Sequence, residues 1–119
     1  MSSMDRAALG LLGERAAEHH LRKLGWRILG RRVRTRSGEI DLVAMDGAEV
    51  VFVEVKSRRS DAFGSPEESV TFRKRQKMRR AAHEYLRGAD RPYRIDVIAV
   101  EINGDRCSIR HYRSAVGEE

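Results

Sequence analysis

The sequence predicts a single α/β domain with a mixed sheet of about five strands flanked by helices, in the order αβββαββ. The chain has 119 residues, which is the length of one domain, and 40% of them are hydrophobic, enough for a core. Two segments have helical spacing with capping residues, and the others are rich in β-branched residues. No linker or repeat divides residues 1–119, and about 1–5 and 114–119 are expected to fray.

The first helix is expected over about residues 5–24, and it ends at Gly25, a residue that suits the position after a helix. One face of this helix carries residues at helical spacing, namely Glu14, Ala17, Leu21 and Leu24. The segment WRIL at 26–29 begins the first strand, which leads into the arginine-rich stretch RRVRTR at 31–36.

Two further strands, GEIDLVAM at 38–45 and EVVFVEVK at 49–56, are joined through Asp46-Gly47, a strong hairpin signal. A loop is expected over 57–66. The second helix starts at about 67 or 71 and runs to 87. Its start is either a capping box at Ser65-Pro66-Glu67-Glu68 or a cap at Thr71, and Gly88 marks its end. Strands YRIDVIAVEI and RCSIRHY follow, separated by an NGD turn.

The charge balance favours a polyanionic partner. The chain has 24 Lys and Arg against 18 Asp and Glu, a net charge of +6, and two basic clusters, RRVRTR and RKRQKMRR. The alternative is a solvated basic surface without a specific partner. A single cysteine, Cys107, excludes an internal disulfide, and no Cys/His spacing suggests zinc. No secretory signal or membrane span is present, so a cytoplasmic protein without a membrane partner is expected.

Three charged side chains are predicted to meet on the hairpin. Glu54 and Lys56 lie two residues apart on one strand and therefore project from the same face. A two-residue turn places Asp41 opposite Phe52, and a four-residue loop places it opposite Glu54. Both registers keep Asp41 on the face of Glu54 and Lys56, whereas a three-residue loop with a bulge would not.

Two carboxylates within reach of one another repel unless a cation lies between them. Mg²⁺ or Mn²⁺ would resolve the conflict between Asp41 and Glu54, because a hard dication prefers carboxylate oxygens. Lys56 would then be placed to orient the attacking water or to help remove its proton. Such a group suits metal-assisted hydrolysis of a phosphodiester.

The same residues resemble a known family. Asp41, a step of thirteen residues and then Glu54-Val55-Lys56 resemble the D…(D/E)xK pattern of the restriction-endonuclease-like, or PD-(D/E)xK, nucleases. The whole chain is similar to the YraN-type family of small predicted endonucleases related to Holliday-junction resolvases. The segments that carry this similarity are GERAAEHHLRKLGWRIL, SGEIDLVA, VFVEVKSR, RKRQKMRRAAHEYL, RIDVIAV and IRHYRSAV.

The resemblance implies a restriction-endonuclease-like three-layer core and assigns roles to individual residues. Asp41 and Glu54 look like metal-binding carboxylates and Lys56 like the catalytic lysine. The carbonyl of Val55 could complete the metal shell, and Glu14 resembles an additional acid of the resolvase-like branch.

Basic residues near this face are candidates for DNA contacts. The arginines of the first cluster precede the strand of Asp41 and could hold phosphates beside the cut. Lys74 is expected to point toward the sheet, where it could hold the scissile phosphate or instead lay its stem on the core with its ammonium in water. Lys77 is expected on the outer side of the second helix, where it would contact the DNA backbone or serve only solubility. The full candidate set is Arg31, Arg32, Arg34, Arg36, Arg58, Lys74 and Lys77.

Structural alternatives exist for each acidic residue and for one histidine. Glu54 and Lys56 could form a simple ion pair at a strand end. Glu14 should meet a metal or a basic group, or else be solvated by rotation of the helix. Glu39 is expected to be exposed, Asp96 to pair with Arg94, and His111 to be packed or hydrogen-bonded.

The sequence thus predicts a metal-dependent endonuclease acting on DNA in structured or branched form. The likeness to resolvases adds a homodimer as one form of assembly. The alternatives are a non-catalytic nucleic-acid-binding domain with this fold, and an adaptor whose basic surface binds an acidic partner.

Overall fold

The computed structural model describes residues 5–59 and 71–115 and has the predicted element order. Its elements are α1 (Arg6–Lys23), β1 (Arg27–Thr35), β2 (Gly38–Asp46), β3 (Glu49–Arg59), α2 (Phe72–Leu86), β4 (Tyr93–Asn103) and β5 (Arg106–Tyr112). The five strands form one sheet in the order β1-β2-β3-β4-β5. Only the β3–β4 pair is parallel, so the mixed α/β sheet is confirmed. The fraying predicted for the termini falls mostly on residues outside the described ranges.

The first helix begins and ends within one residue of the prediction. Asp5 is its N-cap and accepts a hydrogen bond from the Ala8 N–H at 2.8 Å. Gly25 follows it with φ +87°, a conformation that glycine adopts without strain. Leu24 was predicted to share the buried face of Ala17 and Leu21, and this prediction is wrong. Leu24 caps the helix and is 42% exposed.

The β2–β3 hairpin turns one residue later than Asp46-Gly47. Asp46 still pairs with Glu49, and the two turn residues are Gly47, with φ +62°, and Ala48. This register equals that of the four-residue loop. Continued along the strands, it aligns Asp41 with Glu54.

Two predicted boundaries differ from the structure. Residues 57–59, predicted as loop, extend β3 because they continue its parallel pairing with β4, as in Arg59 with Ile102. The rest of that loop, like the capping box at residues 65–68, lies outside the described residues. The second helix begins after the alternative cap, Thr71, which accepts from the Lys74 N–H at 3.3 Å. It ends at Leu86, and its C-cap Arg87, with φ 51°, leads into Gly88.

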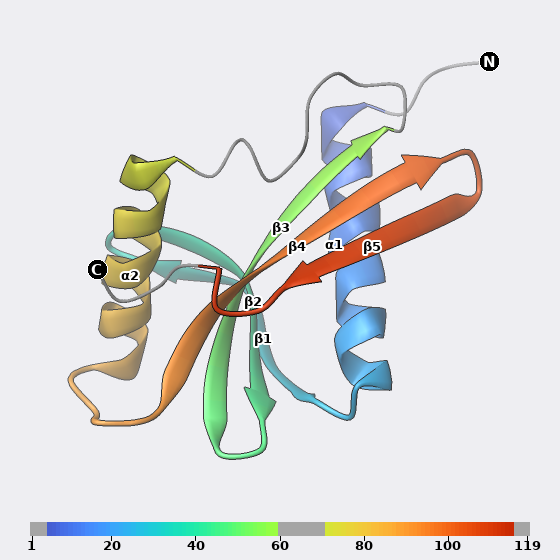
Figure 1. The fold of residues 1–119 in the computed structure, drawn as a ribbon. Helices are drawn as coiled ribbons and strands as arrows, with labels where there is room; N and C mark the ends of the chain where they lie inside the picture. The colour runs from blue at the N-terminus through green and yellow to red at the C-terminus, as the bar shows by residue number, and fades with distance from the viewer. Residues whose placement is uncertain (1–4, 60–70, 116–119) are drawn as a thin grey trace.

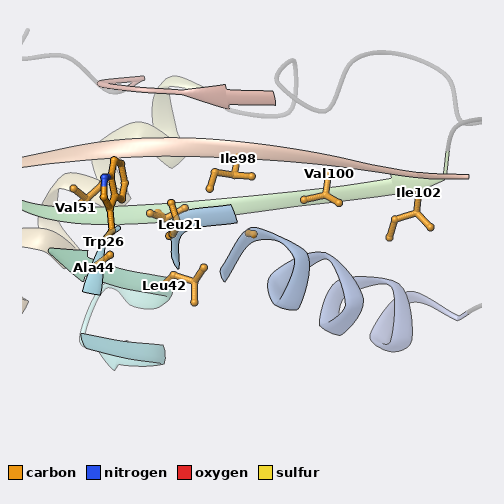
Figure 2. Packing of buried hydrophobic residues seen from close by; sticks show 10 residues of the cluster. Leu21, Trp26, Leu42, Ala44, Val51, Ile98, Val100 and Ile102 are labelled. Atoms are coloured by element: carbon orange, nitrogen blue, oxygen red, sulfur yellow. The ribbon is translucent and has the colours of Figure 1, made fainter. Parts of the chain in front are cut away.

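The helices lie on opposite faces of the sheet, which makes three layers (Figure 1). On the α1 face, buried residues that include Leu21, Trp26, Leu42 and Ile98 form one cluster (Figure 2). On the other face, Phe52 and Ile95 pack with Ala81 and Ala82 of α2. Burial of these apolar side chains drives the layers together. Within the described ranges, neither helix is long and apolar enough to cross a membrane.

Helix α1 approaches β3 very closely at one point. A Cβ added to Gly13 would lie 1.7 Å from Ser57 Oγ, so only glycine fits there without movement of a neighbour. This contact fixes the helix beside the strand that carries Glu54 and Lys56. It also sets the position from which the side chain of Glu14, the next residue of α1, projects.

Candidate active site

The site lies where β2 separates from β3. Ladder pairing between these strands ends at Leu42 and Val53. Continued by two residues, the ladder would pair Val55 with Ile40. Instead, the Val55 N–H donates to Asp41 Oδ2 at 2.8 Å. The Asp41 side chain therefore takes the place of a backbone acceptor, and the ladder is closed by a carboxylate.

The separation also changes the faces of the residues around Asp41. Leu42 packs in the cluster on the α1 face, whereas Ile40, two residues earlier, packs in the cluster on the α2 face. Regular alternation would put both on one face. In a strand, the N–H and C=O of one residue point to the same side, so the Val55 carbonyl is directed toward β2, as its N–H is.

Glu54 and Lys56 are brought together as predicted. The Lys56 Nζ lies 3.0 Å from Glu54 Oε1, and each side chain is 22% exposed. They line a pocket of about 200 Å³ between α2 and the β2–β3 strands, to which Lys74 also contributes, as predicted. Lys77 was expected on the outer side of α2, but it also lines the pocket, because it lies three residues after Lys74 on the same side of the helix. The ion pair offered as the structural alternative is thus present, and it lies beside Asp41.

The charges at this position perturb one another. Burial, and then the negative charge of Glu54, raise the pKa of Asp41 to about 7. Burial alone would lower the pKa of Lys56, but the Glu54 carboxylate beside it raises that pKa above its ordinary value. On the rim, contact with Lys56 lowers the pKa of Lys74. Two acids and two ammonium groups therefore share one small, partly dehydrated space.

Glu14 meets a basic group rather than the two other acids. Its Oε1 accepts a hydrogen bond from Arg32 Nε at 2.9 Å. Arg32 lies on β1 across from Asp41 and has φ 47°, a strained conformation for a residue with a side chain. Glu14 is still close enough to Asp41 to contribute to its raised pKa.

The candidate DNA-binding residues fall into separate groups. Arg31, like Arg32, ties β1 to α1, because its Nη2 donates to Glu18 Oε2 at 2.7 Å. Arg34 and Arg36 are exposed, and the Arg34 side chain is 91% exposed. Arg58 lies apart from Lys74 and Lys77, in a depression beside the start of α1. Glu39 is exposed, as predicted, and lies 4.0 Å from Arg34.

The donors at the gap between β2 and β3 fit a hard dication. Asp41 and Glu54 supply carboxylates, and the Val55 carbonyl is directed to the same side. Mg²⁺ and Mn²⁺ accept such oxygen donors and complete their shells with water. Across residues 5–59 and 71–115, no three or more His, Cys, Asp or Glu side chains form a group that could hold a metal ion. The fit therefore rests on the two carboxylates and the carbonyl, with Glu14 held by Arg32.

A second polar cluster lies on the α1 face. The fully buried Asp96 accepts from Arg94 Nε at 3.0 Å, from the Ser114 N–H at 3.0 Å and from His111 Nε2 at 2.8 Å. The pairing with Arg94 and the hydrogen-bonded His111 were both predicted. The chain also continues to His20 of α1, whose Nε2 lies 3.0 Å from His111 Nδ1. No sequence signal pointed to His20, because 91 residues separate it from His111.

Comparisons with known proteins agree on one family. The model of the uncharacterised protein family UPF0102 matches residues 13–100. A UPF0102 protein of Syntrophomonas wolfei is 44% identical over 110 residues, covering 90% of this chain and 96% of that protein. One of Rhodococcus jostii is 45% identical over 112 residues, covering 91% and 95%. One of Moorella thermoacetica is 50% identical over 101 residues, covering 82% and 84%. The chain therefore belongs to the UPF0102 family, the YraN-type family that its sequence resembles.

Proposed function

We propose that this protein is a cytoplasmic endonuclease that uses Mg²⁺ or Mn²⁺ to hydrolyse phosphodiester bonds in structured or branched DNA. The observation that carries the proposal is the convergence of Asp41, Glu54 and Lys56 at the gap between β2 and β3. Two carboxylates whose mutual repulsion is relieved by a dication, next to an ammonium group, suit phosphodiester hydrolysis better than a purely structural role.

Asp41, Glu54 and the Val55 carbonyl would hold the metal ion. When bound, the ion would supply Lewis-acid activation of the phosphate and of the attacking water. Loss of the proton from Asp41, whose pKa is about 7, would accompany binding.

Lys56 has a raised pKa and is therefore an ammonium group near neutral pH. This state favours orienting the water and stabilising charge on the phosphate over removal of a proton. Lys74 lies on the neighbouring rim and would hold a phosphate oxygen. Its lowered pKa follows from repulsion by Lys56, and a phosphate between the two groups would relieve it.

The exposed arginines Arg34 and Arg36 would contact phosphates along the strand. Arg31 and Arg32 could join them only by sharing or leaving Glu18 and Glu14, their partners on α1. Binding through these side chains should weaken steeply with salt, because each phosphate contact releases counterions.

The decisive experiment measures cleavage of four-way junctions, flaps, nicked duplexes and linear duplexes with Mg²⁺ or Mn²⁺. Asp41→Asn and Lys56→Ala should each lower the cleavage rate by about a hundredfold or more while DNA binding persists. Lys23→Ala, at the exposed end of α1, is the matched control and should keep the wild-type rate.

Two outcomes would contradict the proposal. Salt-sensitive binding without cleavage under either metal would leave a non-catalytic nucleic-acid-binding domain. The absence of binding to any nucleic acid would favour an adaptor for an acidic protein partner.

The proposal includes a homodimer, because cutting both strands of branched DNA takes two active sites. Sedimentation of the protein alone and with a four-way junction measures this directly. A single protein chain per junction at saturation would remove the dimer from the proposal and leave the chemistry intact.

A further inference from the structure

The pocket beside Asp41 and Glu54 has an apolar interior and a basic rim. Its volume is about 200 Å³. The interior is lined by residues of the α2-face core, namely Ile40, Phe52, Met78, Ala81 and Ile95, and by Val53 of β3. The rim carries three ammonium groups, Lys56, Lys74 and Lys77, together with Glu39 and Glu54. An inorganic anion binds through charge and hydrogen bonds, so it would make no favourable contact with this apolar interior.

The rim is shaped by close contacts. Lys74 and Lys77 lie three residues apart on α2 and so project from one side of the helix. The stem of Lys77 lies over Gly38, where an added Cβ would be 2.8 Å from the lysine Cε. Next to Gly38, the Ser37 N–H and hydroxyl both donate to Glu84 of α2, at 2.9 and 2.6 Å. These contacts hold the β1–β2 turn against the helix and keep the mouth of the pocket in place.

We infer that this pocket receives one unpaired nucleotide, with its base or sugar against Phe52 and its phosphate on Lys74 and Lys77. The inference rests on the proposed function and deepens it, because it defines the substrate as a strand with an unpaired nucleotide beside the cut. An apolar interior suits a nucleobase or sugar, and ammonium groups at the mouth complement the phosphate.

The size of the pocket determines what can enter. Sites for drug-sized ligands occupy roughly 300–1,000 Å³, and this one is smaller. A volume of about 200 Å³ would admit a single base or sugar but not a base pair. A base stacked inside a duplex must first leave the stack, which costs least where the strand is already unpaired. The pocket would therefore favour branched, gapped or flapped DNA over a continuous duplex.

Nuclear magnetic resonance of the ¹⁵N-labelled protein without divalent metal separates the possible ligands. Thymidine 5′-monophosphate should shift the amide signals of Phe52 and Met78 as well as those of Lys74 and Lys77. Thymidine should shift the first pair only, and inorganic phosphate the second pair only. Shifts confined to the lysines with thymidine 5′-monophosphate would overturn the inference and leave a simple anion site.

Two substitutions test the pocket in the 119-residue chain. Met78→Trp should fill the interior and weaken binding of thymidine 5′-monophosphate and of a flapped oligonucleotide about tenfold. Its affinity for a fully paired duplex should stay the same. Met45→Trp is the matched control, because Met45 packs on the same core cluster but does not line the pocket. If Met78→Trp fails to fold, Lys77→Glu is the second variant. It should weaken binding of the flapped oligonucleotide more than binding of the fully paired duplex. Equal losses on both would overturn the inference.

Failure of the pocket and failure of the nuclease are distinguishable. A protein that binds thymidine 5′-monophosphate at Phe52 but cleaves no DNA keeps the nucleotide pocket and loses the proposed activity. A protein that cleaves a continuous duplex as fast as a flapped one, with no shift at Phe52, keeps the activity and loses the pocket.

Discussion

Folding buries the carboxyl groups of Asp41, in part, and of Asp96, completely, yet their pKa values move in opposite directions. Burial acts on each in the same sense and favours the protonated form. At Asp96, hydrogen bonds from His111, Ser114 and Arg94 outweigh burial and hold the pKa below its ordinary value. At Asp41, the neighbouring Glu54 adds to burial and the pKa rises to about 7.

The difference lies in compensation rather than in burial. The charge on Asp96 is balanced within the protein by Arg94, which also reaches Asp46 and Glu49 and lies over the Trp26 ring. The Asp41 region holds acids that the protein brings together at a cost. Such a cost persists where function uses it, whereas a satisfied network such as that of Asp96 supports the fold.

The largest effect should come from breaking the balanced cluster. Asp96→Ala removes the acceptor for Arg94 Nε, for His111 and for the Ser114 N–H, and it leaves these buried donors unsatisfied. We expect it to lower the free energy of unfolding by about 4 kcal/mol. Urea denaturation at pH 7 measures this loss. A loss under about 1 kcal/mol would mean that the cluster is not a structural element.

Substitution of Asp41 is expected to raise the free energy of unfolding rather than to lower it. Asp41→Asn keeps an acceptor for the Val55 N–H and removes the repulsion with Glu54, so it should stabilise the metal-free protein by about 2 kcal/mol at pH 8.

The pH dependence of this gain follows from the raised pKa of Asp41. As pH rises from about 4 to about 7, ionisation of Asp41 progressively lowers the free energy of unfolding of the wild type. Above that range the loss is complete. The advantage of Asp41→Asn should therefore vanish near pH 4. Urea denaturation in a chelating buffer at both pH values measures it. A destabilised variant at pH 8 would show that the acids are not in conflict.

Gly13→Ala should disturb both clusters through α1, which carries Glu14 to one and His20 to the other. The added Cβ would lie 1.7 Å from Ser57 Oγ and 2.8 Å from its Cβ. We expect a loss of about 1–2 kcal/mol by thermal or chemical denaturation, as for other overpacked contacts.

Gly10→Ala is the control, because the nearest atom to its added Cβ is Glu14 Oε2 at 4.0 Å. It should stabilise the helix by about 0.5–1 kcal/mol. In a protein that already carries Ser57→Gly, adding Gly13→Ala should cost much less stability than it does in the wild type, because the clashing side chain is gone. An unchanged cost would not come from this contact.

The smallest effect is expected from Glu14→Gln. Its ion pair with Arg32 is exposed on the arginine side, so solvent screens it and its loss should change the free energy of unfolding very little. Removing its negative charge should lower the pKa of Asp41, because Glu14 is the smallest of the influences that raise it. Carbon-detected titration of the Asp41 carboxyl measures this change. A rise in that pKa would show that Arg32, released from Glu14, does not stabilise the Asp41 charge.

The sequence predicted the elements and the shared face of Glu54 and Lys56, because apolar alternation and hairpin spacing fix which side chains point together. It placed the hairpin turn one residue too early, since Asp46-Gly47 and Gly47-Ala48 both put a glycine where φ is positive. It could not predict that β2 leaves the ladder at Asp41, because that irregularity depends on a side chain replacing a carbonyl.

Contacts between distant segments were also beyond the sequence. The arginines of β1 looked free for DNA, but Arg31 and Arg32 meet acids 13 and 18 residues earlier in the chain. Their spacing carries no signal of it, because the position of α1 over β1 is set by packing of the whole sheet. The same holds for His20 and His111.

One oxygen of Asp41 both fastens β3 to β2 and carries the charge on which the chemistry would depend. A proton or a ligand that draws on Oδ2 therefore weakens the bond to the Val55 amide. Exchange of that amide hydrogen with deuterated solvent should quicken whenever the oxygen is engaged elsewhere. The exchange rate of the Val55 amide hydrogen therefore reports whether Asp41 Oδ2 is protonated or bound to a ligand, and it can be measured without any DNA cleavage.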